Sequence, residues 1–179
     1  MATVPPLTEG VAVHHADLNF SLSPPSMACY QNVQQATLVT GTTTLVTFDM
    51  NLYDTDTSGG THSISTNTSR VTPLTAGYHI VTVSLTFVTG ATGIRFIDLR
   101  KNALGVVGGG TRVDLDLRNA SSSLQTTCKM QQVVQFNGTT DHVEVFAQHT
   151  QGVNLGLYSA NQASSWVGSV GIQTRWLNS

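Results

Sequence analysis

The chain has 179 residues and a mass of 19.0 kDa, enough for one domain with a sizeable hydrophobic core. Its net charge of −2 and pI near 6.3 give no basis for binding nucleic acid, and no apolar run approaches the roughly 20 residues that span a bilayer, so we expect neither nucleic-acid binding nor membrane insertion. Only 10 % of residues are charged, against roughly 25 % in ordinary soluble proteins, which favours a β-rich protein whose surface is partly covered by other subunits.

Residues 1–25 differ from the rest of the chain. Pro5 and Pro6 near one end, and Pro24 and Pro25 at the other, resist helix formation and sheet pairing. The sequence therefore predicts an extended N-terminal docking arm over 1–25 and a single domain over 26–179. We see no basic start followed by an apolar stretch and expect no signal peptide. The arm residues expected to dock are Val4, Pro5, Pro6, Leu7, Val11, Val13, Leu18 and Phe20.

From residue 26 onward the pattern is typical of β-strands. Segments 36–48 and 69–74 are rich in Thr and Val, which fit a pleated surface. The stretch 75–87, TAGYHIVTVSLTF, alternates with a period of two, as a half-buried strand does. Its inward set is predicted to be His79, Val81, Val83, Leu85 and Phe87, and its outward set Tyr78, Ile80, Thr82, Ser84 and Thr86.

Five more strands are predicted, over 93–102, 111–119, 123–136, 142–149 and 164–177. In 111–119, Val113, Leu115 and Leu117 alternate with charged residues. Turn signals such as Gly108-Gly109-Gly110 and Asn137-Gly138 separate the strands. About eight to ten short strands with this punctuation predict an all-β fold, an antiparallel jelly-roll β-sandwich.

The order of these pieces resembles the jelly-roll superfamily of the complement globular head and tumour necrosis factor. The resemblance covers roughly residues 28–177. The residues that carry it are Phe48, Tyr53-Asp54, Ala76-Gly77-Tyr78, Lys101-Asn102 and the closing Trp166-x-Gly168.

A narrower resemblance is to globular domains of tailed-bacteriophage virion proteins. Its pattern maps onto Phe48-Asp49, Tyr53-Asp54, His62, Ser69-Arg70 and Ala76-Gly77-Tyr78. The chain shows neither the collagen stem of the complement proteins nor the membrane stalk of the cytokines, which favours a phage or bacterial origin.

The superfamily resemblance implies a homotrimer of jelly rolls. The outward set of 75–87 is uncharged and weakly polar, as a face covered by a neighbour should be. We therefore expect the trimer interface at Tyr78, Ile80, Thr82, Ser84 and Thr86.

No catalytic constellation stands out, so we expect a protein that is not an enzyme and needs no cofactor. There is no metalloprotease His pair, nucleophile elbow or phosphate-binding loop before a helix. Asp54 and Asp56 precede a Gly turn and resemble the start of a calcium loop, but the closing Glu is missing, and an ordinary turn is the favoured interpretation.

The loops at 54–68 and 150–162 are the candidate tips for ligand contact, because binding usually resides in loops on a rigid scaffold. His62, Asn154 and Tyr158 are the side chains that could contact a receptor or sugar. His79 is predicted to be a hydrogen-bonded packing residue. Cys29 and Cys128 could pair in an oxidising setting, although two buried thiols are favoured.

These features predict a structural protein of a virion, exposed on the particle surface after assembly in the host cytoplasm. The arm would bind major capsid or tail proteins, and the trimeric head would reinforce the shell or contact the host. The alternatives are a minor tail protein that binds a host cell-surface glycan and a secreted bacterial adhesion module.

Overall fold

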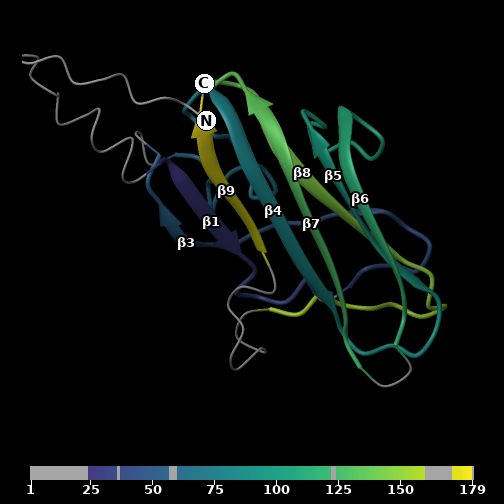
Figure 1. Ribbon diagram of the computed structural model, residues 1–179. Coiled ribbons are helices and arrows are strands. Elements are labelled where there is room, and N and C mark those ends of the chain that lie inside the picture. The colour runs from purple at the N-terminus through teal and green to yellow at the C-terminus, as the bar shows by residue number, and fades with distance from the viewer. Residues whose placement is uncertain (1–23, 36, 57–59, 122–123, 160–170, 179) are drawn as a thin grey trace, which may run out of the picture.

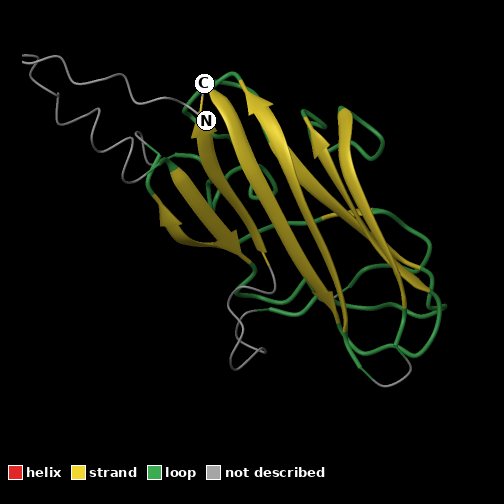
Figure 2. Cartoon of the chain, in the orientation of Figure 1, coloured by secondary structure: helices red, strands yellow, loops and turns green. Residues whose placement is uncertain are grey.

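The computed structural model describes residues 24–35, 37–56, 60–121, 124–159 and 171–178. These residues form nine strands and no helix, and accordingly hold no helix that could span a membrane (Figures 1 and 2). The strands are β1 Ser26–Tyr30, β2 Thr44–Leu45, β3 Met50–Asp54, β4 Gly77–Phe87, β5 Ile94–Lys101, β6 Thr111–Asn119, β7 Thr126–Phe136, β8 Val143–His149 and β9 Gly171–Asn178.

Two antiparallel sheets face each other. One has five strands in the order β3-β1-β9-β4-β7, and the other has four in the order β2-β8-β5-β6 (Figure 1). This arrangement confirms the predicted jelly-roll sandwich. The predicted arm over 1–25 lies almost entirely outside the described residues, as does the Trp166-x-Gly168 segment.

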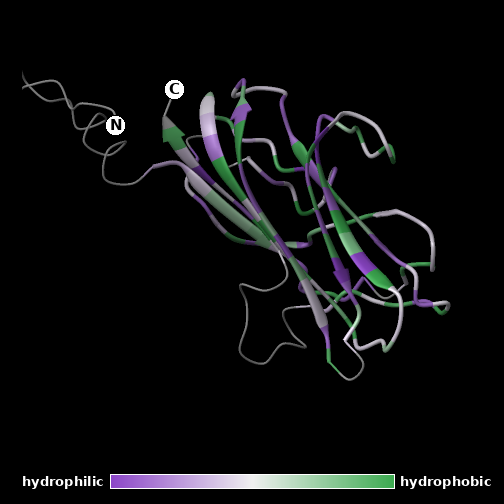
Figure 3. Cartoon of the chain, turned by 45° about the vertical axis from the view of Figure 1, so that its right-hand side comes forward, coloured by the Kyte–Doolittle hydropathy of each residue, from purple (hydrophilic) through white to green (hydrophobic). Residues whose placement is uncertain are grey.

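The hydrophobic core lies between the sheets, and hydropathy alternates along the strands (Figure 3). The inward set of β4 is buried as predicted and packs against residues of β5, β7 and β8. Gly77, the first residue of β4, has a backbone φ of 126°, in the region that favours glycine. A glycine here therefore allows the chain to enter β4 without backbone strain. Core members include Phe48, Val83, Phe87, Ile97, Leu99, Val145 and Ile172.

His79 is a packing residue, as predicted. It is buried, its Nε2 donates to the Thr75 carbonyl over 2.8 Å, and its ring lies edge-on to Phe136 with 5.2 Å between centroids. With the proton on Nε2, the buried Nδ1 has no partner. Burial lowers the pKa of His79 because the protonated ring would lose its hydration, and the Thr75 carbonyl opposes that effect only in part.

Two of the predicted strands do not form over their predicted ranges. Segment 36–48 contains only β2 and a bridge from Leu38 to Leu155, because the chain turns at Gly41 (φ = 74°). Segment 69–74 contributes only a bridge from Val71 to Val143, and Pro73 has no N–H to extend it. The sequence did not reveal β3, an edge strand whose residues are mostly exposed and so do not alternate.

Strand β6 is oriented differently from an ordinary half-buried strand. Its carboxylates turn toward β7: Asp116 accepts from the Lys129 amide, and Asp114 from the Gln132 side chain. Leu115 and Leu117 are left 41 % and 52 % exposed on the outward side of the four-stranded sheet. The alternation is real, but at the sheet edge the polar row, rather than the apolar row, contacts the other sheet.

Candidate functional site: the outward face of the five-stranded sheet

The outward face of the five-stranded sheet is built by cross-strand register. In antiparallel pairs, residues directly opposite each other lie on the same face. Ile80 on β4 lies opposite Val133 on β7 and Arg175 on β9. One step along, Thr82 lies between Gln131 and Gln173, and Gln173 in turn faces Ala28 on β1. The face is thus a continuous surface of apolar and amide side chains.

Four of the five strands described in this sheet bring no carboxylate to the face. Strands β1, β9, β4 and β7 contain no Asp or Glu, and their cations are Lys129 and Arg175. Val133 is 58 % exposed and Tyr78 42 % exposed beside the half-buried Ile80. A large, nearly uncharged surface with exposed apolar groups is more typical of a contact face than of a surface that meets only water.

The predicted trimer-interface residues divide into two groups. Tyr78, Ile80 and Thr82 are accessible and remain candidates. Ser84 and Thr86 are buried within the single chain, so they offer almost no area to a second copy. The chain itself surrounds Thr86: its hydroxyl lies 2.9 Å from that of Thr127, and its carbonyl accepts from the Tyr158 amide. Sequence reasoning missed Val133, because the register that places it beside Ile80 cannot be read from β7 alone.

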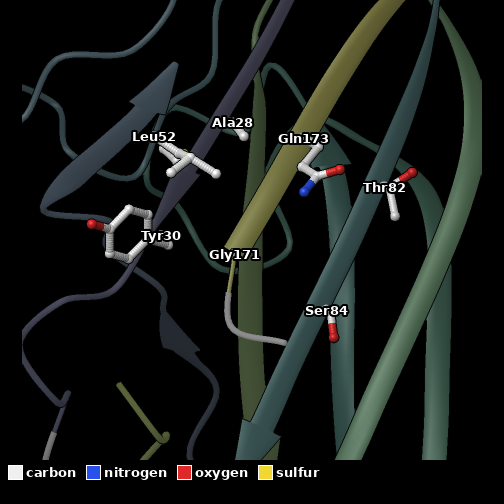
Figure 4. A pocket seen from close by; sticks show the side chains of 8 residues that line it. Ala28, Tyr30, Leu52, Thr82, Ser84, Gly171 and Gln173 are labelled. Atoms are coloured by element: carbon white, nitrogen blue, oxygen red, sulfur yellow. The ribbon is translucent and has the colours of Figure 1, made fainter. Parts of the chain in front are cut away.

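Two hollows interrupt the face. The larger, about 520 Å³, is lined by Pro24, Tyr53, Ile80, Gln131 and Arg175 among others. The smaller, about 60 Å³, lies between Leu52 and Tyr30 on one side and Thr82 and Ser84 on the other (Figure 4). Gly171 also lines it, and a Cβ atom at this residue would come within 2.3 Å of the Cys29 carbonyl oxygen. Glycine at this position therefore allows β1 and β9 to lie together.

The two predicted ligand-contact loops lie at opposite ends of the sandwich. Asp54 pairs with Met27 near the start of β1, which places the 55–76 connection at the end where the N-terminal segment enters. Tyr158 bonds to Thr86 near the end of β4, which places 150–159 at the other end.

His62 is not a surface contact residue. Its side chain is buried, with Nδ1 2.6 Å from Asn51 Oδ1 and Nε2 3.0 Å from the Thr68 carbonyl. Burial lowers the pKa of His62, an effect the Thr68 carbonyl partly offsets. The expectation that His62 could contact a receptor or sugar is wrong, because Asn51 and Thr68 contact its buried ring, and these contacts cannot be read from the sequence.

Asp54 and Asp56 hold the same loop through backbone amides. Asp54 accepts from the amides of Asp56 and Thr61, and Asp56 accepts from those of Leu74 and Thr75. Within the described residues, no three His, Cys, Asp or Glu side chains gather closely enough to hold a metal ion. Both carboxylates thus act as hydrogen-bond acceptors for the backbone of this connection.

At the opposite end, Asn154 is exposed and Tyr158 is half-buried. The Tyr158 hydroxyl accepts from Gln125 Nε2 over 2.9 Å, and the residue packs against the core. Asn154 thus remains available to a ligand, whereas Tyr158 presents only part of its ring.

The cysteines are unpaired, buried thiols. Burial raises the pKa of Cys128 to about 12 and that of Cys29 well above its usual range. A thiol that stays protonated is a poor nucleophile, so both are packing residues.

Several residues of the phage-like pattern make contacts within the chain. Phe48 is in the core, and Asp49 accepts from the amides of Asn32 and Val33. Ser69 and Arg70 both donate to the fully buried Glu144, which also accepts from the Gly105 amide. Ser69 and Arg70 therefore hold the 55–76 connection against β8, whereas Tyr53 and Tyr78 of the same pattern remain exposed.

No protein-family model and no curated protein matches the sequence. Solved structures do match. The globular domain of the zebrafish complement 1qA protein is 13 % identical with a TM-score of 0.54, over 86 % of this chain and 98 % of that one.

Murine APRIL, from a crystal at pH 5.0, is 11 % identical with a TM-score of 0.61, over 86 % of this chain and 99 % of that one. The Eiger TNF structure from S. frugiperda is 14 % identical with a TM-score of 0.55, over 87 % of this chain and 94 % of that one. At these identities the likeness concerns the fold alone: the chain folds as a complement-head and tumour-necrosis-factor type of jelly roll.

Proposed function

We propose that this protein is a non-enzymatic structural component of a tailed-bacteriophage particle, built as a homotrimer of jelly rolls. The observation that supports the homotrimer in this proposal is the outward face of the five-stranded sheet. It exposes Val133 and Tyr78 around Ile80 and has no carboxylate on four of its five strands. A second copy of the chain would remove this apolar area from water, which favours association.

The ends of the sandwich suggest how such a trimer would be oriented. The N-terminal segment joins the body at Pro24, whereas Asn154 lies at the far end. With arms docked on capsid or tail proteins, the far-end loops would point away from the particle, where a host surface is met. Three arms per trimer would add avidity to contacts that are weak one by one.

The trimer is tested by sedimentation of two matched variants. Val133→Glu places a charge on the proposed contact face, and Leu117→Glu places the same charge on the outward side of the other sheet, at similar exposure. We expect a trimer for the wild type and Leu117→Glu, and a monomer for Val133→Glu. A monomeric wild type at micromolar concentration would refute the oligomer.

The particle role is tested by deleting residues 1–25. The shortened chain should fold and associate normally but fail to join particles, because the docking residues Val4 to Phe20 are gone. Retained incorporation would show that the arm is not the anchor. Binding of a defined sugar by the free protein, without binding to shells, would favour the glycan-binding alternatives instead.

A further inference from the structure

Arg95 is a fully buried cation at the far end of the sandwich, close to the loop that follows β8. It is the second residue of β5 and lies opposite His149 of β8. Its guanidinium donates to the carbonyls of Gly90, Thr92 and Ile94 and to the Gln151 side chain. Among the described residues no carboxylate forms an ion pair with Arg95, although buried charges in proteins are usually paired.

One edge of this guanidinium is only partly used. Nε and Nη2 lie on the edge that a carboxylate can bridge with two parallel hydrogen bonds. Nη2 donates to the Gly90 carbonyl and to Gln151, whereas the buried Nε has no hydrogen-bond partner among the described residues. Burial also lowers the pKa of Arg95, because the charged form loses its hydration and only neutral oxygens replace it. An anionic acceptor at this edge would therefore stabilise the guanidinium.

The Gln151 amide occupies the place that such an acceptor would take. Its Oε1 lies 2.6 Å from Arg95 Nη2. A Cβ atom at Gly90 would come within 1.7 Å of the same oxygen, so the amide fills the space left by the missing side chain of residue 90. Gln151 is half-buried and is followed by Gly152 at φ = 92°. Its side chain can rotate toward solvent, a motion that takes picoseconds to nanoseconds at a protein surface.

We propose that Arg95 anchors a binding site for the carboxylate of an acidic sugar, which displaces the Gln151 amide and bridges Nε and Nη2 of the guanidinium. Segments 88–95 and 148–159 contain no Asp or Glu that would repel this ligand. Two exposed hydroxyl residues lie beside Gln151 and suit the hydroxyl groups of a sugar ring. Thr92 Oγ1 is 3.4 Å from the Gln151 carbonyl oxygen, and Thr150 precedes Gln151 in the chain.

The test is an NMR titration of the full chain with galacturonate, with galactose as the control that lacks the carboxylate. We expect millimolar galacturonate to shift the backbone amides of Gly90, Thr92 and Gln151, because the groups bonded to Arg95 rearrange. Galactose should leave them unchanged. Acetate should bind about fivefold more weakly than galacturonate, because it has no hydroxyl groups to bond. Equal affinity for acetate would overturn the assignment to a sugar.

Three variants test the mechanism. Gln151→Ala removes the competing amide and should tighten galacturonate binding about tenfold. Gly90→Ala is compatible with the backbone, because Gly90 has no positive φ, but its methyl group fills the carboxylate position and should abolish binding. Gln151→Glu supplies an internal carboxylate, so it should block galacturonate and raise the melting temperature. Gln125→Ala, which removes an exposed amide bonded to Tyr158, is the matched control and should leave the affinity unchanged.

No shift with galacturonate, or the same affinity in the wild type, Gln151→Ala and Gly90→Ala, would overturn the proposal. A melting temperature of Gln151→Glu below that of the wild type would also contradict it. The site lies within one subunit and needs neither a trimer nor a particle. Its failure would therefore leave the sedimentation and particle-incorporation tests of the proposed function unaffected.

Discussion

Replacing Asp56 by Ala should destabilise the domain strongly, although the residue lies in a segment that reads as a surface turn. Its carboxylate is buried, accepts from the Leu74 amide at 2.7 Å and the Thr75 amide at 3.1 Å, and also accepts from the Thr75 hydroxyl. These contacts hold the chain immediately before β4. Removing the carboxylate leaves two amides without their acceptor.

Each stranded buried donor costs about 1–3 kcal/mol, so we expect the free energy of unfolding to fall by about 3 kcal/mol. For a domain of this size that corresponds to a melting temperature lower by about 6–12 °C. Urea denaturation followed by tryptophan fluorescence measures the first quantity, and calorimetry the second. If Asp56→Ala does not fold, Asp56→Asn, which keeps one acceptor oxygen, should fold with a smaller loss.

Asp114→Ala is the matched control, because Asp114 is only partly buried at the edge strand and bonds to the side chain of Gln132. It should change the free energy of unfolding by no more than about 0.5 kcal/mol. An Asp56→Ala protein as stable as this control would refute the capping argument. Calcium and chelators should leave the wild-type melting temperature unchanged; a calcium-dependent rise would restore the metal-site interpretation of Asp54 and Asp56.

Three more predictions concern the interior. The pKa values of His62 and His79 are lowered in the folded state, so the unfolded chain binds more protons once the pH falls below the ordinary histidine pKa near 6.5. The stability that both histidines contribute is therefore present above about pH 6.5 and is lost as the pH falls. We expect His79→Gln to reduce the change in the urea midpoint between about pH 7.5 and pH 5.5. The Cys29 and Cys128 thiols should not react with a disulfide reagent in native buffer and should react fully in denaturant; rapid native labelling would contradict their burial. Gly171→Ala should cost about 1–3 kcal/mol, because the new methyl group meets the Cys29 carbonyl, and an unchanged urea midpoint would show that β1 and β9 can separate freely.

Strand identity was predictable wherever one side of a strand is buried by the opposite sheet. The 75–87 stretch alternates because its inward residues fill the core, and the inward position of His79 follows from the same period. Edge elements could not be predicted in this way. The residues of β3 are exposed on both sides, and at β6 the carboxylates rather than Leu115 and Leu117 contact the other sheet.

The candidate site, too, was predictable from the sequence only in part. The sequence showed that the outward residues of β4 are uncharged, but it did not show which of them are accessible to a partner. Ser84 and Thr86 have the same period and polar character as Thr82, yet both are buried within the single chain, and Thr86 contacts Thr127 and Tyr158. His62 likewise reads as a polar loop residue until Asn51 and Thr68 are seen beside its ring.

The sequence by itself determined the fold class, the inward row of the central strand and the lack of charge on its outward row, because each depends on local periodicity and composition. Only the tertiary structure decided which residues share a face. Cross-strand register joins Ile80 to Val133 and Arg175, and loop closure places the candidate loops at opposite ends. Contacts between residues this far apart in the chain leave no pattern in either segment alone.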